Sequence, residues 1–190
     1  MNNGGIVKMN YDDEEFDRDF GTNGSVRANS TITTCALEYG VSQPYGFSTV
    51  TAMAKASNVK DHTGEAIYVS GPDAKVIGMD ADGNCLEIIW GGELGRTHFK
   101  KKDKFHPKSL TIRSIGGEDH LLISSMEIWC FKYKNNKRCK NNSYKHDLKL
   151  YSKNLTTGTV KQYNLNDKYR QALQHTTSMT IDLNGEYLYS

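Results

Sequence analysis

The sequence predicts an all-β protein built as an antiparallel meander. Short runs rich in Val, Ile, Thr and Tyr recur along the chain, and these residues suit a pleated, half-buried surface. Turn dipeptides separate the runs, among them Asp82-Gly83 and Asn184-Gly185, and such dipeptides between apolar runs are the strongest short-range signal for a hairpin. The clearest stretch is 65–90, where three short runs follow one another with no room for a helix.

The composition is that of a globular domain of ordinary size. The 190 residues are 37% hydrophobic and 24% charged, so the chain is long enough to bury a core. No apolar run approaches the roughly 20 residues that span a bilayer, so we expect no membrane span. A net charge of +2 gives little reason to expect nucleic acid. The N-terminus lacks the pattern of a secretory signal, which slightly favours the cytoplasm; a processed form beginning here would be extracellular.

Two regions are expected along the chain. Residues 1–24 form an acidic, Asn/Gly-rich tail, because the acidic block 12–19 and its surroundings offer little to bury. Residues 25–190 form a single all-β domain.

The first half of this domain contains two expected strands before the meander. Residues 30–39 (STITTCALEY) alternate loosely, and a loop over 40–46 follows. Residues 47–56 (FSTVTAMAKA) fit a strand or a helix by periodicity, and their Thr-Val-Thr run favours the strand because β-branched side chains suit it. We expect residues 57–64 to form a loop.

The meander then has strands over 65–70, 75–79 and 85–90, joined by turns at Gly71-Pro72-Asp73 and Asp82-Gly83. Beyond it come a glycine-rich break and a basic loop, after which the pattern repeats with almost no helix. The break covers 91–95 and the loop 98–108; later strands are expected over 109–115, 120–125, 126–133, 148–152, 159–163, 178–183 and 186–189, with turns at 116–119, 157–158 and 184–185, and a helical turn within 169–175.

Four cysteines show no metal-binding spacing. Cys35, Cys85 and Cys130 lie in apolar strand patterns and are interpreted as small buried hydrophobic residues. A disulfide between Cys130 and Cys139 across the intervening turn is possible if the chain is exported.

The string IYVSGPDAKVIGMDADGNCLEIIW, residues 67–90, resembles the repeat of quinoprotein-like and WD40-like β-propellers, with a strand ending in Trp after an Asp-x-x-x-Gly turn. HPKSLTIRSIGGEDHLLISSMEIWCFKY, residues 106–133, looks like the inner strands of another blade. The resemblance covers about residues 50–190 and implies a propeller or part of one. A two-sheet sandwich or jelly roll explains the same strands without a repeat, and the expected inner strands are spaced more widely than in common blades.

The Asp80 to Asn84 segment carries oxygen ligands at the first, third and fifth positions of an EF-hand loop. Cys85 stands where that loop needs Gly, and Gly91 where it needs Glu, so a hairpin turn is the better interpretation. We expect no metal site and no cofactor.

Aromatic and basic residues mark the expected binding surfaces. The segment Trp90 to Arg96 is similar to the W-G-x-E-x-R segment of galectins, although Arg96 lies one residue too late. An aromatic residue at a strand end beside a polar loop is still a plausible stacking platform for a sugar or peptide. The densest positive patch follows it and suits an acidic partner. The candidate binding residues are Trp90, Arg96, Lys100, Lys101, Lys102, Trp129 and Tyr133.

No catalytic motif is present, so no catalytic residue is predicted and an enzyme is not favoured. The sequence therefore favours a non-enzymatic binding module that presents loops on a rigid β scaffold to a protein or peptide partner. A carbohydrate-binding, lectin-like domain and a structural subunit of a larger assembly are the alternatives.

Overall fold

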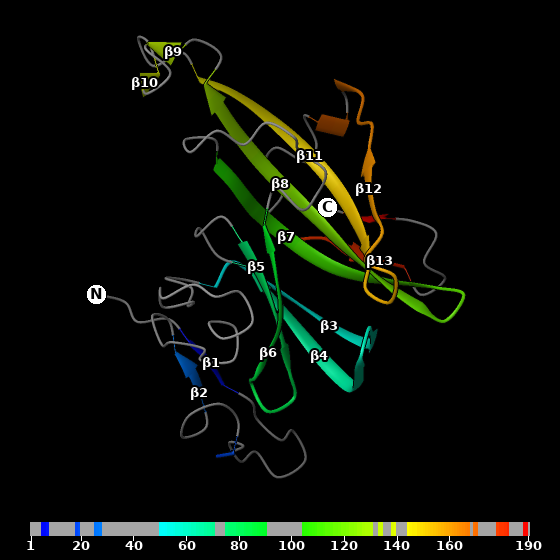
Figure 1. Cartoon of the computed structure of the whole chain (residues 1–190). Coiled ribbons are helices and arrows are strands. Elements are labelled where there is room, and N and C mark those ends of the chain that lie inside the picture. Colours follow the sequence, from blue (N-terminus) through cyan, green and yellow to red (C-terminus); the bar gives the residue numbers. More distant parts are fainter. Residues whose placement is uncertain are drawn as a thin grey trace.

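The chain is all-β, with two four-stranded antiparallel sheets (Figure 1). The computed structural model describes residues 5–7, 18–19, 25–27, 50–70, 75–90, 104–130, 133–134, 138–139, 144–167, 169–170, 178–182 and 188–189. Within these ranges only the backbone is described for 5–7, 25–27, 90, 104, 129–130, 133–134, 138–139, 144–145 and 189. No helix in these ranges is both long and apolar enough to cross a membrane.

The first sheet has the strand order β3-β4-β5-β6, which is also the order along the chain. Its strands are β3 (Ala52–Val59), β4 (His62–Ser70), β5 (Lys75–Asp80) and β6 (Cys85–Trp90). Both faces of this sheet are buried along β5 and at the end of β4. Ala66 and Tyr68 of β4 belong to the main core, while Val69, the residue after Tyr68, points to the opposite face and is equally buried. This double burial explains why β5 is an unbroken buried run rather than an alternating one.

The second sheet has the order β12-β11-β8-β7 and longer strands. They are β7 (Lys104–Ile115), β8 (Glu118–Cys130), β11 (Tyr144–Asn154) and β12 (Val160–Tyr163). Gly116 and Gly117 join β7 to β8 with φ values of 59° and 84°, the left-handed pair that a two-residue hairpin turn requires. Pro107 lies where the register of β7 shifts, as expected for a residue that cannot donate to the ladder.

Three short strand pairs accompany the two larger sheets. β1 (Gly5–Val7) pairs with β2 (Ser25–Arg27), and β9 (Tyr133–Lys134) pairs with β10 (Arg138–Cys139). β13 (Thr180–Ile181) pairs with β14 (Leu188–Tyr189) in a register symmetric about Asn184-Gly185. Met179, beside β13, packs with Leu122 and Leu150 on the outer face of the second sheet.

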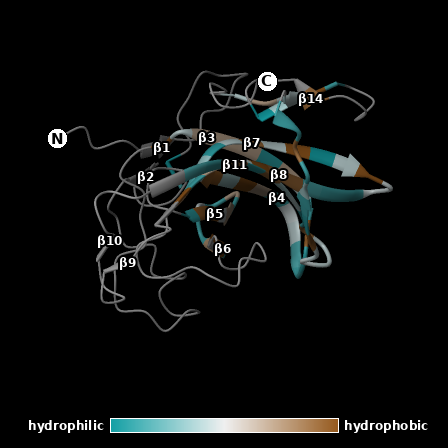
Figure 2. Cartoon of the chain, turned by 90° about the horizontal axis from the view of Figure 1, so that it is seen from above, coloured by the Kyte–Doolittle hydropathy of each residue, from teal (hydrophilic) through white to brown (hydrophobic). Residues whose placement is uncertain are grey.

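The main core lies between the two sheets. The first sheet contributes Tyr68, Val76 and Ile89, and the second contributes Phe105, Leu121, Ile123 and Tyr151, all 1% exposed or less. β3 lies beside β7, so the first strands of the two sheets are neighbours. In Figure 2, which views the molecule from above, β5 and β6 are drawn lower in the picture than β7, β8 and β11. Burial of this apolar interface holds the two sheets together.

A polar contact fixes the alignment of the sheets at one end. β3 contains a bulge between Ala56 and Asn58, which takes backbone groups out of the regular ladder. The Asp119 carboxylate of β8 accepts hydrogen bonds from the Ser57 amide at 2.6 Å and the Asn58 amide at 3.0 Å. The bulge of one sheet is therefore anchored on a buried side chain of the other.

Most strand predictions are confirmed within the described residues. The strands over 65–70, 75–79 and 85–90, the hairpin at 116–119 and the hairpin with its turn near 157–158 are all present. Asp167, Tyr169 and Arg170 have helical backbone, so the expected helical turn begins slightly earlier than predicted. The strand expected over 30–39 and the turn at 71–73 lie outside the described residues, and the division at residue 24 stays a prediction.

Two predicted loops are wrong. Residues 57–64 are not a loop, because β3 runs to Val59, turns at Lys60-Asp61 and returns as β4 from His62. Asp61 adopts a φ of 56°, a left-handed conformation that aspartate tolerates better than most residues. The basic loop was predicted to extend to Lys108, but β7 begins at Lys104, since Phe105 is buried in the core.

Candidate functional site

A pocket of about 420 Å³ opens where turns from both sheets meet. The β3–β4 turn, the first residues of β6 and the end of β11 with its following turn surround it. Its lining is Val59, Lys60, Asp61, His62, Cys85, Leu86, Glu87, Lys153, Leu155 and Gly158. The lining combines apolar side chains with both signs of charge.

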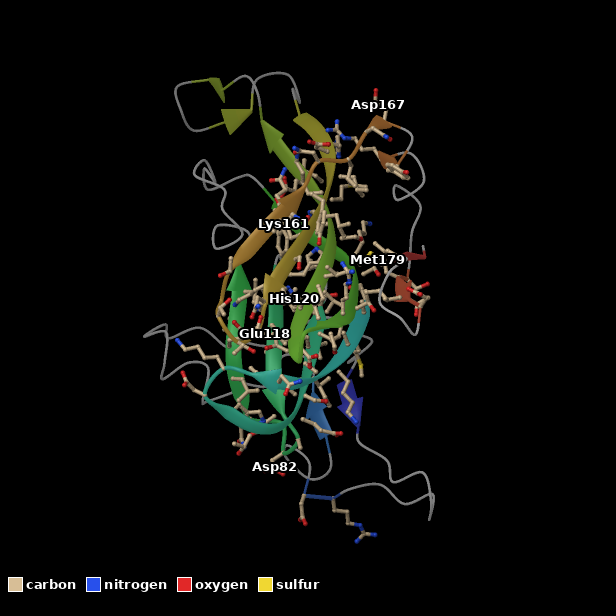
Figure 3. All side chains as sticks on the ribbon, turned by 90° about the vertical axis from the view of Figure 1, so that its right-hand side faces the viewer. Asp82, Glu118, His120, Lys161, Asp167 and Met179 are labelled. Carbon is tan, nitrogen blue, oxygen red and sulfur yellow. The ribbon has the colours of Figure 1, made fainter. Side chains whose placement is uncertain are left out.

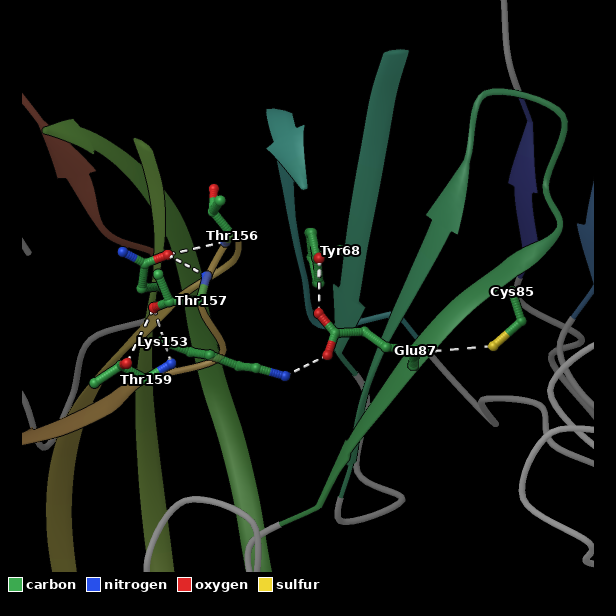
Figure 4. Close-up of polar contacts among 8 residues, drawn as sticks. Tyr68, Cys85, Glu87, Lys153, Thr156, Thr157 and Thr159 are labelled. Carbon is green, nitrogen blue, oxygen red and sulfur yellow. Dashed lines mark hydrogen bonds and ion pairs between the residues drawn. The ribbon is translucent and has the colours of Figure 1, made fainter. Parts of the chain in front are cut away.

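The less exposed of the two ion pairs in the pocket lining joins the two sheets and is here called the pocket floor; Figure 4 shows its contacts. Lys153 of β11 extends from the second sheet and contacts Glu87 Oε2 of β6 through its ammonium. The other oxygen, Glu87 Oε1, accepts a hydrogen bond of 2.8 Å from the Tyr68 hydroxyl. The Lys153 and Glu87 side chains are 14% and 21% exposed, so the pair is largely withdrawn from water but reaches the pocket. Glu87 thus joins the buried core to the pocket.

Gly78 allows Tyr68 to reach Glu87. The three residues lie opposite one another on β4, β5 and β6. A Cβ atom at Gly78 would lie 2.8 Å from Tyr68 Cε1 and 3.3 Å from Glu87 Cγ, so the tyrosine ring occupies the space that a side chain would fill. A glycine inside a strand often marks a close approach of this kind.

Burial raises the pKa of the Tyr68 phenol, and the negative charge and hydrogen bond of Glu87 raise it further. Tyr68 therefore stays protonated at neutral pH and donates to Glu87. Because its side chain is fully buried, Tyr68 supports the pocket without contacting a ligand.

The walls of the pocket are tied together by backbone and side-chain bonds. The Lys60 amide donates to the Leu155 carbonyl at 2.9 Å, which joins the β3–β4 turn to the turn after β11. Asn154 Oδ1 accepts from the amides of Thr156 and Thr157 at 2.9 Å each, an arrangement typical of an Asx turn. The Asn154 side-chain amide donates to Glu118, close to His120, on the β8 segment labelled in Figure 3. The pocket is therefore built on fixed turns.

Asp119 stabilises the end of β3 that leads into the pocket lining. Burial alone would raise the pKa of its carboxyl, but hydrogen bonds from the Ser114 hydroxyl and the amides of Ser57 and Asn58 outweigh burial and lower it. Asp119 is 2% exposed and acts as an ionised structural acceptor.

Cys85 takes part in a disulfide, with a partner outside the described side chains. Its burial was predicted correctly, but its interpretation as a simple small hydrophobic residue is wrong. Its sulfur lies 3.8 Å from the Glu87 carbonyl oxygen (Figure 4), and this is a contact rather than a hydrogen bond because a disulfide sulfur carries no hydrogen. Structural disulfides are typical of oxidising compartments. The predicted Cys130–Cys139 pair lies outside the described side chains.

The predicted calcium-like segment is a hairpin turn, as expected. Asp80 Oδ1 accepts from the Asp82 and Asn84 amides at 2.9 and 2.7 Å, and Gly83 has a φ of 84°. Asp80 Oδ2 accepts from the Asn84 side chain at 3.0 Å. Both carboxylate oxygens of Asp80 thus stabilise the turn. No group of three His, Cys, Asp or Glu suited to a metal occurs among the side chains that are described.

A second, smaller pocket of about 220 Å³ is lined by Met126, His146, Asp147, Leu148 and Arg170. Asp147 already contacts two cations, Lys149 at 2.7 Å and Arg170 at 3.7 Å. Its charge is therefore balanced locally, and the larger pocket is the better candidate.

None of the predicted binding residues has a described side chain. The backbones of Trp90, Trp129 and Tyr133 belong to β6, β8 and β9, whereas Arg96, Lys100, Lys101 and Lys102 lie outside the described residues altogether. Trp90 ends β6, whose opposite end lines the larger pocket. The Trp90 backbone and the residues of β6 that line the pocket therefore lie at opposite ends of the strand, and the aromatic platform stays a prediction.

The pocket residues were not identified from the sequence. They come from three segments, 59–62, 85–87 and 153–158, that lie far apart in the chain. One signal was available: Glu87 is a single acid inside an apolar strand, and a largely buried carboxylate needs a partner.

No protein-family model, no curated protein and no solved structure matches this chain.

Proposed function

We propose that this chain is a non-enzymatic binding module that holds a protein or peptide partner in the pocket between its turns. The observation that carries the proposal is the 420 Å³ pocket, walled by turns from both sheets, with an ion pair at its floor. This volume lies towards the low end of the range for ligand pockets, about 300–1,000 Å³. It suits one or two side chains of a partner.

The polar groups of the pocket support binding rather than proton transfer. Glu87 is held by both Tyr68 and Lys153, and Tyr68 is buried beneath it. These bonds fix the floor in one geometry, and preorganisation of this kind reduces the cost of binding.

For the scaffold we favour a two-sheet sandwich over propeller blades. Both sheets are up-and-down meanders with neighbouring first strands, which suits either architecture. Blades repeat one unit, however, and here the strands differ in length: β3 to β6 have 6–9 residues, whereas β7, β8 and β11 have 11–13. An experimental structure showing further blades of equal size would contradict this choice.

The test is selection from a displayed random peptide library. Lys60 is an exposed turn residue at the pocket, so Lys60→Trp should obstruct the pocket without disturbing the core. Lys161→Trp is the matched control, since Lys161 is exposed on β12 and does not line the pocket (Figure 3). We expect peptides that bind the wild type and Lys161→Trp but lose binding to Lys60→Trp. Enrichment of no such peptide would refute the proposal.

A further inference from the structure

We infer that the pocket recognises an acidic side chain of its partner, with the carboxylate seated on the Lys153 ammonium. The inference rests on the proposed function and specifies the chemistry of the group that enters the pocket. It follows from counting the donors and acceptors at the pocket floor.

Lys153 has hydrogen-bonding capacity that its protein partner does not use. An ammonium has three N–H donors. Among the described residues its contact is with one oxygen, Glu87 Oε2. Two donors are therefore available at a position that is only 14% exposed, where a charge-assisted hydrogen bond is stronger than in open water.

The carboxylate beside it is more fully engaged. Glu87 accepts from the Tyr68 hydroxyl with one oxygen and from Lys153 with the other. Tyr68 is buried, so Glu87 Oε1 is directed towards the core and away from an entering ligand. A cationic ligand group would find one acceptor site on the accessible oxygen, Glu87 Oε2, that no described residue uses, whereas a carboxylate would find two such N–H donors on Lys153. A carboxylate would instead bridge to the ammonium.

The exposed residues at the mouth of the pocket, Lys60 and Asp61, are here called the rim, and they too favour an acidic ligand group. Lys60 and Asp61 form a loose ion pair with a nitrogen–oxygen distance of 4.0 Å, and their side chains are 66% and 86% exposed. The acid of the rim is thus the more solvated partner, and its charge is screened more strongly. His62, also in the lining, adds ring nitrogens and no negative charge. A carboxylate passing this rim meets little uncompensated repulsion.

The test uses the peptides that lose binding to Lys60→Trp. In each peptide every Asp or Glu is replaced in turn by Asn or Gln, and affinity is measured by calorimetry on the wild-type protein. We expect one replacement to weaken binding about tenfold or more, which corresponds to the loss of a hydrogen bond to a charged group. This measurement needs no protein variant and so does not depend on the folding of one.

Lys153→Gln should then bind the acidic peptide no more tightly than its amide counterpart, because the ammonium is gone and Glu87 is left unpaired. Lys149→Gln is the matched control, because Lys149 is on the same strand, is 18% exposed and is also paired with an acid, but does not line this pocket. Discrimination that persists in Lys153→Gln, or that is also lost in Lys149→Gln, would overturn the assignment to Lys153. If pocket-dependent peptides exist but no acid matters beyond about twofold, the inference fails while the proposed function stands. If no pocket-dependent peptide exists, the proposed function itself fails.

Discussion

Replacing Gly78 by alanine should destabilise the protein, although alanine is normally the better residue inside a strand. The added Cβ would lie 2.8 Å from Tyr68 Cε1, about 0.6 Å closer than the near limit of an ordinary contact at 3.4 Å. The ring is fully buried against the second sheet and cannot swing into open space. Movement of the ring away from β5 would stretch the 2.8 Å bond to Glu87.

The expected cost follows from three terms. Overpacking costs about 1–3 kcal/mol, and loss of a hydrogen bond to a charged group costs about 1.5–3 kcal/mol. Replacing glycine by alanine in a strand otherwise stabilises the folded state by roughly 0.5–1 kcal/mol. We therefore expect Gly78→Ala to lower the free energy of unfolding by about 1.5–5.5 kcal/mol. Urea unfolding followed by tryptophan fluorescence measures this change.

Measuring Gly78→Ala in a Tyr68→Leu variant tests whether the clash with Tyr68 causes the destabilisation. In Tyr68→Leu the ring atoms near Gly78 are absent, so Gly78→Ala should there be neutral or slightly stabilising. Both single variants and the double variant form a thermodynamic cycle. An equal cost of Gly78→Ala in the two backgrounds, or a wild-type free energy of unfolding in Gly78→Ala itself, would refute the assignment of the clash to Tyr68.

Three further predictions concern the buried polar groups. The folded-state pKa of Asp119 is lowered. Its contribution to stability is therefore complete above the unfolded pKa near 3.9 and is lost as pH falls through the folded value. Unfolding measured between about pH 7 and 2 should show this loss in the wild type and not in Asp119→Asn. Cys85→Ser should lower the free energy of unfolding by about 2–4 kcal/mol, and reduction of the wild type should have a similar effect that Cys85→Ser does not show. In urea unfolding, Tyr151→Phe should lower the free energy of unfolding more than Tyr68→Phe does, because Tyr151 donates to the fully buried Glu127, which water cannot reach. Equal decreases in the two variants would contradict this reasoning.

The hairpins could be predicted because their turns are encoded locally. Gly83, Gly116 and Gly117 supply left-handed residues where the turns need them, and the predicted positions agree with the observed ones. The Lys60-Asp61 turn was missed because neither residue is a glycine, and the predicted loop extended to Gly64, inside what is in fact β4. Local propensity therefore succeeds where a turn depends on glycine and fails where the surrounding sheet imposes it.

The start of β7 shows a different limit. The sequence around Lys104 is highly charged, and charge predicts a loop when only composition is considered. Phe105 nevertheless enters the core, and the exposed Lys108 lies between Pro107 and Ser109, where the register shifts. A strand with this mixture of buried and charged positions is recognised only when its partner β8 is known. The pocket could not be predicted from the sequence either, because three segments that lie far apart in the chain form it.

The core and the pocket are coupled through Glu87, and this coupling gives ligand binding a measurable effect on stability. Tyr68 and Lys153 contact the two oxygens of one carboxylate, so the same group holds the inter-sheet contact and the pocket floor. A ligand that binds only the folded state stabilises it by about 2.7 kcal/mol at 100 times its dissociation constant. An acidic peptide seated on Lys153 should therefore offset most of the destabilisation in Gly78→Ala if the pocket survives the displacement of Tyr68. It should offset little if that displacement also moves Glu87, because affinity would fall together with stability.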